Sequence, residues 1–528
     1  MFYSEPIPAV SCPVEPPYAC EPMTDGSFRS APTEAGRLQR VVSLIGLGIG
    51  PVLAVTVALL LPDSVPGTDG PVELGHAARI TAAVASLMAV WWLTEAIPLS
   101  ATALLPLALL PMLGARSIDQ TAAPYARSVI FLFLGGFMLG LAMERWGLHK
   151  RIALIIIRAV GTGPRAIIAG FMIATAMLSA FVSNTATVIM LMPIASSVLS
   201  TLPEQDHAPE GARTRFATCL VLAIAYAASI GGVATLIGTP PNAILAGFVQ
   251  GRSEYDIAFG QWLLHALPLV LVMLPIAYLL LVGPLFRIKG AVGGSRETIA
   301  NELHELGPMN PGEWAVLIIS AITACLWIFK DLIMRIPALG AWGISLNDAQ
   351  IAMLAAVALF VTPVDKTCST FAMNWETASK APFGILLLFG GGLSLAAAVS
   401  GTGLDAAIGQ QFARLNGVPI WLIVLGLCLT VTLLTELTSN TAVTTAMLPV
   451  MAAAGTALGI DDAYLLLPVA LSASCAFMLP VATPPNAVAF STKHVSIGQM
   501  ARTGMVFNIV FACLITVWVM IVAPRLLT

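Results

Sequence analysis

The sequence predicts an all-α polytopic membrane protein made of two inverted repeats, and two observations lead to this fold class. Of its 528 residues, 58% are hydrophobic and only 10% are charged, a composition typical of many membrane-spanning helices. The polar triplet Ser-Asn-Thr also occurs twice inside apolar segments, at residues 183–185 and 439–441. Asn440 follows Asn184 by 256 residues (440 − 184 = 256), which indicates a duplication.

Apolar segments along the chain are long enough to supply about eleven membrane-spanning helices. These segments lie near residues 41–61, 79–115, 127–147, 213–236, 242–250 with 258–286, 312–330, 346–363, 381–400, 464–482 and 503–524. The second segment is long enough for two helices with a tight turn between them near Pro98.

Two further apolar segments, at about 162–200 and 418–455, each carry one Ser-Asn-Thr triplet near the middle. Polar groups inside the hydrocarbon of a membrane need hydrogen-bond partners. A helix interrupted there by polar residues more naturally enters the membrane and returns to the same side. We therefore expect two re-entrant hairpins with the triplets at their tips.

The repeat extends beyond the triplets. Five more positions match at the offset of 256 residues: Phe133, Gly135, Gly136, Gly147 and Leu148 correspond to Phe389, Gly391, Gly392, Gly403 and Leu404. The motif Thr-Pro-Pro-Asn also occurs twice, at 239–242 and 483–486, with an offset of 244. If each repeat holds five spans and one hairpin, the odd number of spans inverts the second copy, as in many secondary transporters.

These boundaries divide the chain into four parts. Residues 1–40 contain seven prolines and no apolar run, which predicts a disordered tail, and residues 41–78 hold the first helix and a loop. The first inverted repeat covers 79–290 and the second covers 312–528. Because Lys and Arg are more frequent on the side of the tail, we expect an integral plasma-membrane or inner-membrane protein with a cytoplasmic N-terminus.

The two motifs have the chemistry of an ion-binding site. Ser, Asn and Thr favour helix N-caps and proline suits a first helical turn, so two tips and two broken helices would bring four helix N-termini near the middle of the membrane. Helix N-termini attract anions, while freed carbonyls and side-chain oxygens can bind a small hard cation such as Na⁺. No Lys or Arg lies close to either motif, so a bound anion would be held by helix dipoles, hydroxyls and co-bound cations. Anion and cation binding would then depend on each other, as symport requires.

Other classes of function fit the sequence less well. The net charge of −3 does not indicate a nucleic-acid partner. The absence of metalloprotease, P-loop and nucleophile-elbow motifs argues against an intramembrane enzyme, as does the absence of a nucleophile–base pair. An anion channel would be expected to show a repeated ring of pore residues rather than a pocket at broken helices.

The chain resembles the divalent anion/sodium symporter family, which includes sodium–dicarboxylate and citrate carriers. The matching motifs are Trp92-Leu-Thr-Glu-Ala-Ile-Pro98, Phe131-Leu-Phe-Leu-Gly-Gly-Phe137, both Ser-Asn-Thr triplets and both Thr-Pro-Pro-Asn motifs. The resemblance covers about residues 41–528. It implies a homodimer in which a fixed scaffold domain carries a moving transport domain, as in an elevator, and it implies co-transported Na⁺.

The resemblance also implies roles for individual residues. The substrate pocket would be formed by Ser183, Asn184, Thr185, Thr239, Pro240, Ser439, Asn440, Thr441, Thr483 and Pro484. The first Na⁺ site would use Ser179, Ser183, Asn184 and the carbonyl of Gly238. The second Na⁺ site would use Thr435, Asn440 and the carbonyl of Ala482.

Several substrates and coupling modes are compatible with these motifs. The doubled triplet fits an elongated dianion with a carboxylate at each end, which favours the C4-dicarboxylates succinate, fumarate and malate. The alternatives are a dicarboxylate exchanger of the same fold without sodium coupling, a citrate carrier and a sulfate carrier. Glu436, next to Thr435, is a charge near the site for which the sequence gives no role. Glu95 fits either a functional site or a turn beside Pro98.

Overall fold

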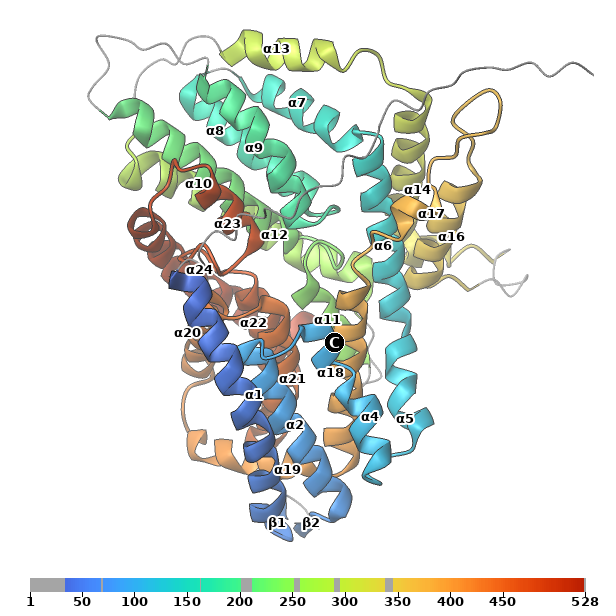
Figure 1. Ribbon diagram of the computed structural model, residues 1–528, viewed down its shortest axis with the longest axis vertical. Helices are drawn as coiled ribbons and strands as arrows, with labels where there is room; N and C mark the ends of the chain where they lie inside the picture. Colours follow the sequence, from blue (N-terminus) through green and yellow to red (C-terminus); the bar gives the residue numbers. More distant parts are fainter. Residues whose placement is uncertain are drawn as a thin grey trace, which may run out of the picture.

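The computed structural model describes residues 34–67, 70–161, 163–200, 211–250, 257–288, 295–337 and 345–526. Figure 1 shows an almost entirely helical molecule. The strands in the described ranges, β1 (Ser64–Gly67) and β2 (Gly70–Glu73), form a short antiparallel pair at the lower end of Figure 1. The predicted all-α class is therefore confirmed.

The helices follow the predicted apolar segments. In the first half of the chain they are α1 (Glu34–Leu60), α2 (His76–Thr94), α3 (Leu99–Thr102), α4 (Leu105–Met112), α5 (Ile118–Ala122), η1 (Ala123–Ala126), α6 (Ser128–Arg145), α7 (Leu148–Val160), α8 (Pro164–Ser179), α9 (Asn184–Ser200), α10 (Ala212–Gly232), α11 (Pro240–Gln250), α12 (Phe259–Leu280) and η2 (Leu281–Leu285). In the second half they are α13 (Ser295–Glu305), α14 (Pro311–Ile333), α16 (Asp348–Val361), α17 (Trp375–Ala378), α18 (Phe383–Gly401), α19 (Leu404–Phe412), η3 (Ala413–Leu415), α20 (Ile420–Leu437), α21 (Asn440–Leu458), α22 (Asp462–Ala473), α23 (Pro484–Ser491) and α24 (Ile497–Leu526).

In the described ranges, ten helices are long and apolar enough to cross a membrane. Two of them, α20 and α21, are the arms of the second predicted hairpin. Three other predicted spans are present as shorter apolar segments: α3 with α4, α16, and α22. The arms of the first hairpin, α8 and α9, are also too short for a full crossing.

The first helix begins earlier than the sequence suggested. Residues 34–40, which we expected in the disordered tail, belong to α1. The last proline before this helix is Pro32, and Glu34, Ala35 and Arg37 favour a helical backbone, so nothing stops the helix from extending outward from its apolar part. Residues 1–33 lie outside the described part of the chain.

The turn predicted near Pro98 is present. Helix α2 ends at Thr94, and Glu95 follows it in a left-handed conformation with φ +48°. Pro98 then precedes α3, and the indole of Trp92 donates to the Leu99 carbonyl at 3.2 Å. Glu95 thus occupies the C-cap of a helix within this turn.

The two repeats have opposite orientations in the molecule. Gly147 and Gly403 occupy equivalent positions before α7 and α19, and both have a positive φ, +70° and +73°. Glycine adopts this conformation at little cost, which explains why both copies keep it. Figure 1 shows α7 near the upper end of the molecule and α19 near the lower end, as an inverted repeat requires.

Equivalent aromatic residues of the two repeats touch each other. The rings of Phe133 in α6 and Phe389 in α18 are both buried and pack edge to face, with centroids 5.3 Å apart. Gly135 and Gly391 allow close helix packing beside them, because a Cβ at Gly391 would lie 2.4 Å from the Ala103 carbonyl oxygen. The repeated glycines of α6 and α18 therefore serve packing.

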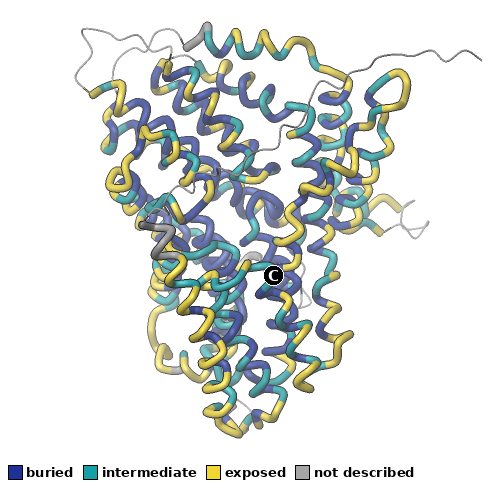
Figure 2. The backbone as a smooth tube through the Cα atoms, viewed as in Figure 1, coloured by how far each residue is buried: buried dark blue, intermediate teal, exposed yellow. Residues whose placement is uncertain are grey.

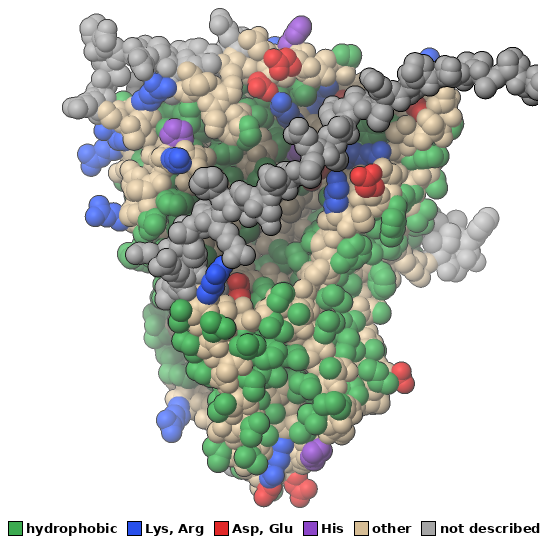
Figure 3. Space-filling model, in the orientation of Figure 1, with side chains coloured by type: hydrophobic (Ala, Val, Ile, Leu, Met, Phe, Trp, Pro, Cys, Tyr) green, Lys and Arg blue, Asp and Glu red, His purple; other side chains and the backbone are tan. Residues whose placement is uncertain are grey.

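The surface fits a protein surrounded by lipid. Figure 3 shows hydrophobic side chains over much of the visible face, with charged side chains mainly near its upper and lower ends. The outer helices α1 and α14 are largely exposed, whereas α10 is buried throughout from Phe216 to Gly232. Figure 2 shows that the most buried segments lie in the interior. The Thr-Pro-Pro-Asn motif that follows α10 is therefore held inside the protein.

Candidate functional site

Both Ser-Asn-Thr triplets lie where one hairpin arm ends and the next begins. In the first repeat, α8 ends at Ser179 and α9 begins at Asn184, and the Ser183 hydroxyl accepts a hydrogen bond from the Ala186 N–H at 3.2 Å. In the second repeat, α21 begins at Asn440, with Ser439 at its N-cap position. Each triplet therefore starts a returning helix, as N-cap preferences predict.

Both Thr-Pro-Pro-Asn motifs start a helix after a non-helical segment. Helix α10 ends at Gly232 and α11 begins at Pro240, while α22 ends at Ala473 and α23 begins at Pro484. The Thr483 hydroxyl accepts from the Asn486 N–H at 3.3 Å and caps α23. Two broken helices are thus formed: α10 and α22 end several residues before the prolines, and the prolines suit the first turn of α11 and α23.

The broken helices and hairpins of the two repeats pack against each other crosswise. Helix α11 of the first repeat packs on α21 of the second, and α23 of the second repeat packs on α9 of the first. All four of these helices begin at a residue of the repeated motifs. The two halves of the molecule therefore meet at the motif-bearing helices.

Three oxygen atoms surround the Asn184 side chain at the first tip. With its amide in one orientation, Oδ1 accepts from the Ser179 hydroxyl at 2.5 Å. With the amide turned over, its nitrogen donates to Ser179 Oγ at 2.5 Å and to the Ala228 and Gly238 carbonyls at 3.3 Å each. The turned-over orientation satisfies both the amide and its neighbours, so it is the favoured one and the amide nitrogen faces the three oxygens. Turning the amide back would add Oδ1 to the Ser179 hydroxyl and the two carbonyls, which is a donor set that suits a hard cation.

Close backbone approach makes two glycines necessary in this cluster. A Cβ at Gly232 would lie 2.6 Å from Asn184 Oδ1, and a Cβ at Gly238 would lie 2.5 Å from the Gly232 carbonyl oxygen. Thr235 ties the same segment to the hairpin, since its hydroxyl donates to the Ala180 carbonyl and accepts from the Gly238 N–H at 3.1 Å. The tip and the break of the first repeat therefore form one packed unit.

The second tip holds an amide oxygen without a partner. Asn440 Oδ1 is buried and has no hydrogen-bond partner among the described residues. The buried Thr435 hydroxyl nearby in sequence donates to the Thr432 carbonyl at 2.9 Å. A buried oxygen is normally paired, so the free Asn440 Oδ1 is available to a ligand.

Burial differs among the predicted substrate-contacting residues. Ser183 and Pro484 are exposed, while Asn184, Thr185, Pro240, Ser439, Asn440 and Thr441 are partly buried. Thr239 and Thr483 are buried, as are the predicted cation-site residues Ser179, Gly238, Thr435 and Ala482. Each predicted cation site therefore combines buried residues with less buried ones, namely Ser183 and Asn184 in the first site and Asn440 in the second.

The last residue of each Thr-Pro-Pro-Asn motif anchors the non-helical segment before it. Asn242 donates to the carbonyls of Gly232, Val233 and Thr235 at 3.2, 3.2 and 2.8 Å. Asn486 donates to the equivalent carbonyls of Ala476 and Leu479, both at 3.1 Å. The two copies therefore share individual contacts as well as sequence, a role that the sequence reasoning did not assign to these asparagines.

Glu436 has a definite set of partners that the sequence could not indicate. Its carboxylate is buried and accepts from three consecutive backbone N–H groups, those of Phe477, Met478 and Leu479. It also accepts from the side-chain amide of Asn508 in α24 at 2.7 Å. Glu436 therefore binds the second broken helix to the second hairpin.

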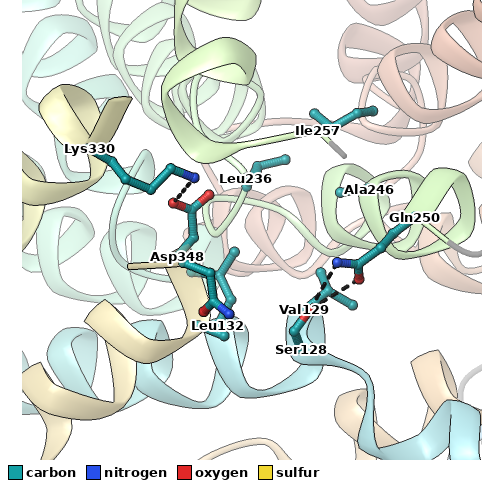
Figure 4. Close-up of a pocket in the computed structure, with 11 residues that line it drawn as sticks. Ser128, Val129, Leu132, Leu236, Ala246, Gln250, Ile257, Lys330 and Asp348 are labelled. Atoms are coloured by element: carbon teal, nitrogen blue, oxygen red, sulfur yellow. Dashed lines mark hydrogen bonds and ion pairs between the residues drawn. The ribbon is translucent and has the colours of Figure 1, made fainter. Parts of the chain in front are cut away.

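A separate polar cavity lies between α6, α11, α14 and α16 (Figure 4). It measures about 70 Å³ and is lined by an ion pair between Lys330 and Asp348 at 2.9 Å and by the hydrogen-bonded pair of Ser128 and Gln250. The residues that line it include none of the predicted site residues. This cavity is therefore distinct from the cluster at the hairpin tips.

Comparison with known proteins gives a consistent result over nearly the whole chain. The model of the family described as "Sodium:sulfate symporter transmembrane region" matches residues 50–526. The sodium-dependent dicarboxylate transporter SdcS of Staphylococcus saprophyticus is 40% identical over 496 residues, which cover 92% of each chain. SdcS of Staphylococcus aureus strain USA300 is 40% identical over 508 residues, which cover 95% of this chain and 94% of that protein.

Two solved transporter structures have a similar fold at much lower sequence identity. The YdaH transporter of Alcanivorax borkumensis is 16% identical with a TM-score of 0.58, covering 92% of this chain and 98% of its own. MtrF of Neisseria gonorrhoeae is 12% identical with a TM-score of 0.56, covering 92% of this chain and 94% of its own. At these identities the likeness concerns the fold alone.

Proposed function

Because the chain belongs to the sodium:sulfate symporter family, the divalent anion/sodium symporters, we propose that it is a secondary active transporter coupling dicarboxylate uptake to Na⁺. The relatives with 40% identity are named sodium-dependent dicarboxylate transporters, which supports this assignment. The integral membrane location follows from the apolar helices and from the family.

The oxygen cluster around Asn184 is the observation that carries the sodium coupling. The first Na⁺ would bind Ser179, Ser183, Asn184 and the Gly238 carbonyl, and the converging oxygens of this cluster support that role. The second Na⁺ would bind Thr435, Asn440 and the Ala482 carbonyl. The unpaired Asn440 Oδ1 supports this second site.

The substrate would bind between the two tips, where the N-termini of α9, α11, α21 and α23 supply N–H groups and partial positive charge. Hydroxyl and amide groups of both triplets, with Thr239 and Thr483, would contact its carboxylates. We propose a C4-dicarboxylate such as succinate, fumarate or malate, because two equivalent triplets suit one carboxylate each. Bound Na⁺ would offset the charge of the dianion, so each ligand would raise the affinity for the other.

The movement that we propose is an elevator. Both hairpins, both broken helices and the helices that follow them would move against a scaffold that includes α6, α14 and α16. Reversible polar contacts cross this boundary: Gln250 with Ser128, and the Phe259 N–H with Asp348 at 2.7 Å. The family resemblance further supports a homodimer in the plasma or inner membrane, and the distribution of Lys and Arg supports a cytoplasmic N-terminus.

Uptake of radiolabelled succinate into proteoliposomes tests the coupling directly. An inward Na⁺ gradient is expected to drive accumulation, and replacement of Na⁺ by K⁺ or choline is expected to abolish it. Uptake that persists unchanged without Na⁺ would reject symport. If such uptake also requires succinate inside the vesicles, the protein is an exchanger, whereas competition by sulfate or citrate but not by malate would reject the substrate assignment.

A further inference from the structure

The carboxylate of Glu436, near the end of hairpin arm α20, holds the backbone of the second broken helix. We propose that Glu436 is a positioning residue that sets the Na⁺ affinity of the second cation site, so that the two cation sites of this transporter are unequal. The inference rests on the proposed function, because it takes Thr435, Asn440 and the Ala482 carbonyl as that site.

The contacts of Glu436 use both of its oxygens. Oε1 accepts from the N–H groups of Phe477 and Met478 at 2.7 and 2.9 Å and from the Asn508 amide at 2.7 Å. Oε2 accepts from the N–H groups of Met478 and Leu479 at 3.1 and 2.9 Å. All partners are N–H donors, which match an acceptor-only carboxylate and give short, strong bonds. With Glu436 only 3% exposed, water competes little for them.

These bonds connect two of the proposed cation ligands. Glu436 directly follows Thr435 along α20. At the other end, the Leu479 carbonyl accepts from the Ala482 N–H at 3.2 Å and from the Asn486 amide at 3.1 Å. Leu479 is thus bonded on both sides: its N–H donates to Glu436, and its carbonyl accepts from the N–H of Ala482, the residue whose own carbonyl is a proposed ligand. A shift of Glu436 would therefore move Thr435 and Ala482 apart.

The first repeat achieves the same geometry without a charge. The position equivalent to Glu436 is Ala180 (436 − 256 = 180), and the position equivalent to Leu479 is Thr235 (479 − 244 = 235). There the Thr235 hydroxyl donates to the Ala180 carbonyl and accepts from the Gly238 N–H. The second repeat therefore has a carboxylate where the first has only the methyl side chain of Ala180. A negative charge attracts a cation more in the interior of a protein than in water.

The variant Glu436→Gln tests this role, because it keeps the side-chain size while it removes the charge and turns an amide toward backbone donors. We expect the Na⁺ concentration for half-maximal succinate uptake to rise by about 10–100-fold, the usual range when an outer partner of a metal site is lost. High Na⁺ should restore much of the uptake. Binding of radioactive sodium to the purified full-length protein should weaken in parallel. The matched variant in the first repeat is Thr235→Val, which removes the uncharged hydroxyl that bonds to the Ala180 carbonyl of the first hairpin.

A purely structural Glu436 would give a different result. It would lower the thermal unfolding temperature and the number of active carriers, but it would leave the Na⁺ dependence of the folded protein unchanged, and this outcome overturns the inference. If Glu436→Gln does not fold, Glu436→Asp and Asn508→Ala decide by the same measurement, and an unchanged Na⁺ dependence in both overturns it. Wild-type uptake that needs no Na⁺ would instead reject the proposed function before any variant is compared.

Discussion

The segments 233–239 and 474–483 are equivalent breaks in two helices, and they are held in place by partly different means. In both, the side-chain amide of the asparagine that follows the break, Asn242 or Asn486, donates to equivalent backbone carbonyls. The contact with the hairpin differs: the Thr235 hydroxyl makes it in the first repeat, and the Glu436 carboxylate makes it in the second. The two breaks thus share the asparagine contacts but differ in the group that links them to the hairpin, and variants of Thr235 and Glu436 compare the two arrangements.

Removing either tip amide should have the largest effect. Asn184→Ala and Asn440→Ala are each expected to abolish succinate uptake, because each variant loses an amide oxygen proposed as a Na⁺ ligand. Uptake in proteoliposomes measures the loss, and size-exclusion chromatography verifies that the protein is folded. A wild-type rate in either variant would remove that residue from the site and end the functional equivalence of the two tips.

The next largest effect is expected from a methyl group at the end of α10, directly before the first break. Gly232→Ala places a Cβ 2.6 Å from Asn184 Oδ1, so the amide must move away and the uptake rate should fall by about tenfold, roughly 1.4 kcal/mol in activation free energy. The second repeat already carries Ala476 at the equivalent position. Initial uptake rates measure the effect.

A matched control for this substitution is Gly426→Ala in α20, where a Cβ meets no atom within 4 Å. This variant should keep the wild-type rate. Equal losses in both variants would show that glycine substitution harms the protein in general, and the close approach at Gly232 would then have no special role.

Loss of the Thr235 hydroxyl, which links the first break to the first hairpin, should have a moderate effect. Thr235→Val removes a hydroxyl that makes two hydrogen bonds, to Ala180 and Gly238, and we expect the Na⁺ concentration for half-maximal uptake to rise roughly fivefold, which corresponds to about 1 kcal/mol. Thr235→Ser should restore the wild-type value because it keeps the hydroxyl. If Thr235→Val changes Na⁺ dependence more than Glu436→Gln does, the proposed inequality of the two sites is wrong in sign.

The smallest effect is expected from a change at Tyr226, a residue of the first repeat that contacts the second break. The Tyr226 hydroxyl donates to the Phe477 carbonyl at 2.8 Å, next to the N–H groups that Glu436 holds. Tyr226→Phe should lower the free energy of unfolding by about 1 kcal/mol, because one buried acceptor loses its partner. Unfolding of the purified protein in detergent measures this change. A loss of Na⁺ dependence without a loss of stability would instead assign Tyr226 to the cation site.

Much of the fold could be predicted because its signals are local. Both copies of Thr-Pro-Pro-Asn begin a helix, as proline in a first helical turn predicts, and the shared register of the two triplets is enough to reveal the duplication. The extra helical residues of α1 were missed because a proline-rich composition was extended too far along the chain. The short helices α16 and α22 were expected to be full spans because hydropathy does not show where a helix ends.

The candidate site was less predictable because several of its atoms have no sequence signal. The Ala228 carbonyl faces Asn184, but any residue supplies a carbonyl. The partners of Glu436 are backbone N–H groups about forty residues away, and only tertiary structure brings them together. A usable signal did exist for Asn242 and Asn486, since both copies of the motif keep them.

The contact between Phe133 and Phe389 constrains how the two repeats can change. Equivalent residues that touch must lie beside the axis that relates the two copies, where each ring faces its own counterpart. A mutation of one ring therefore alters the surface against which its own counterpart packs, so the two halves are not free to diverge independently at this point.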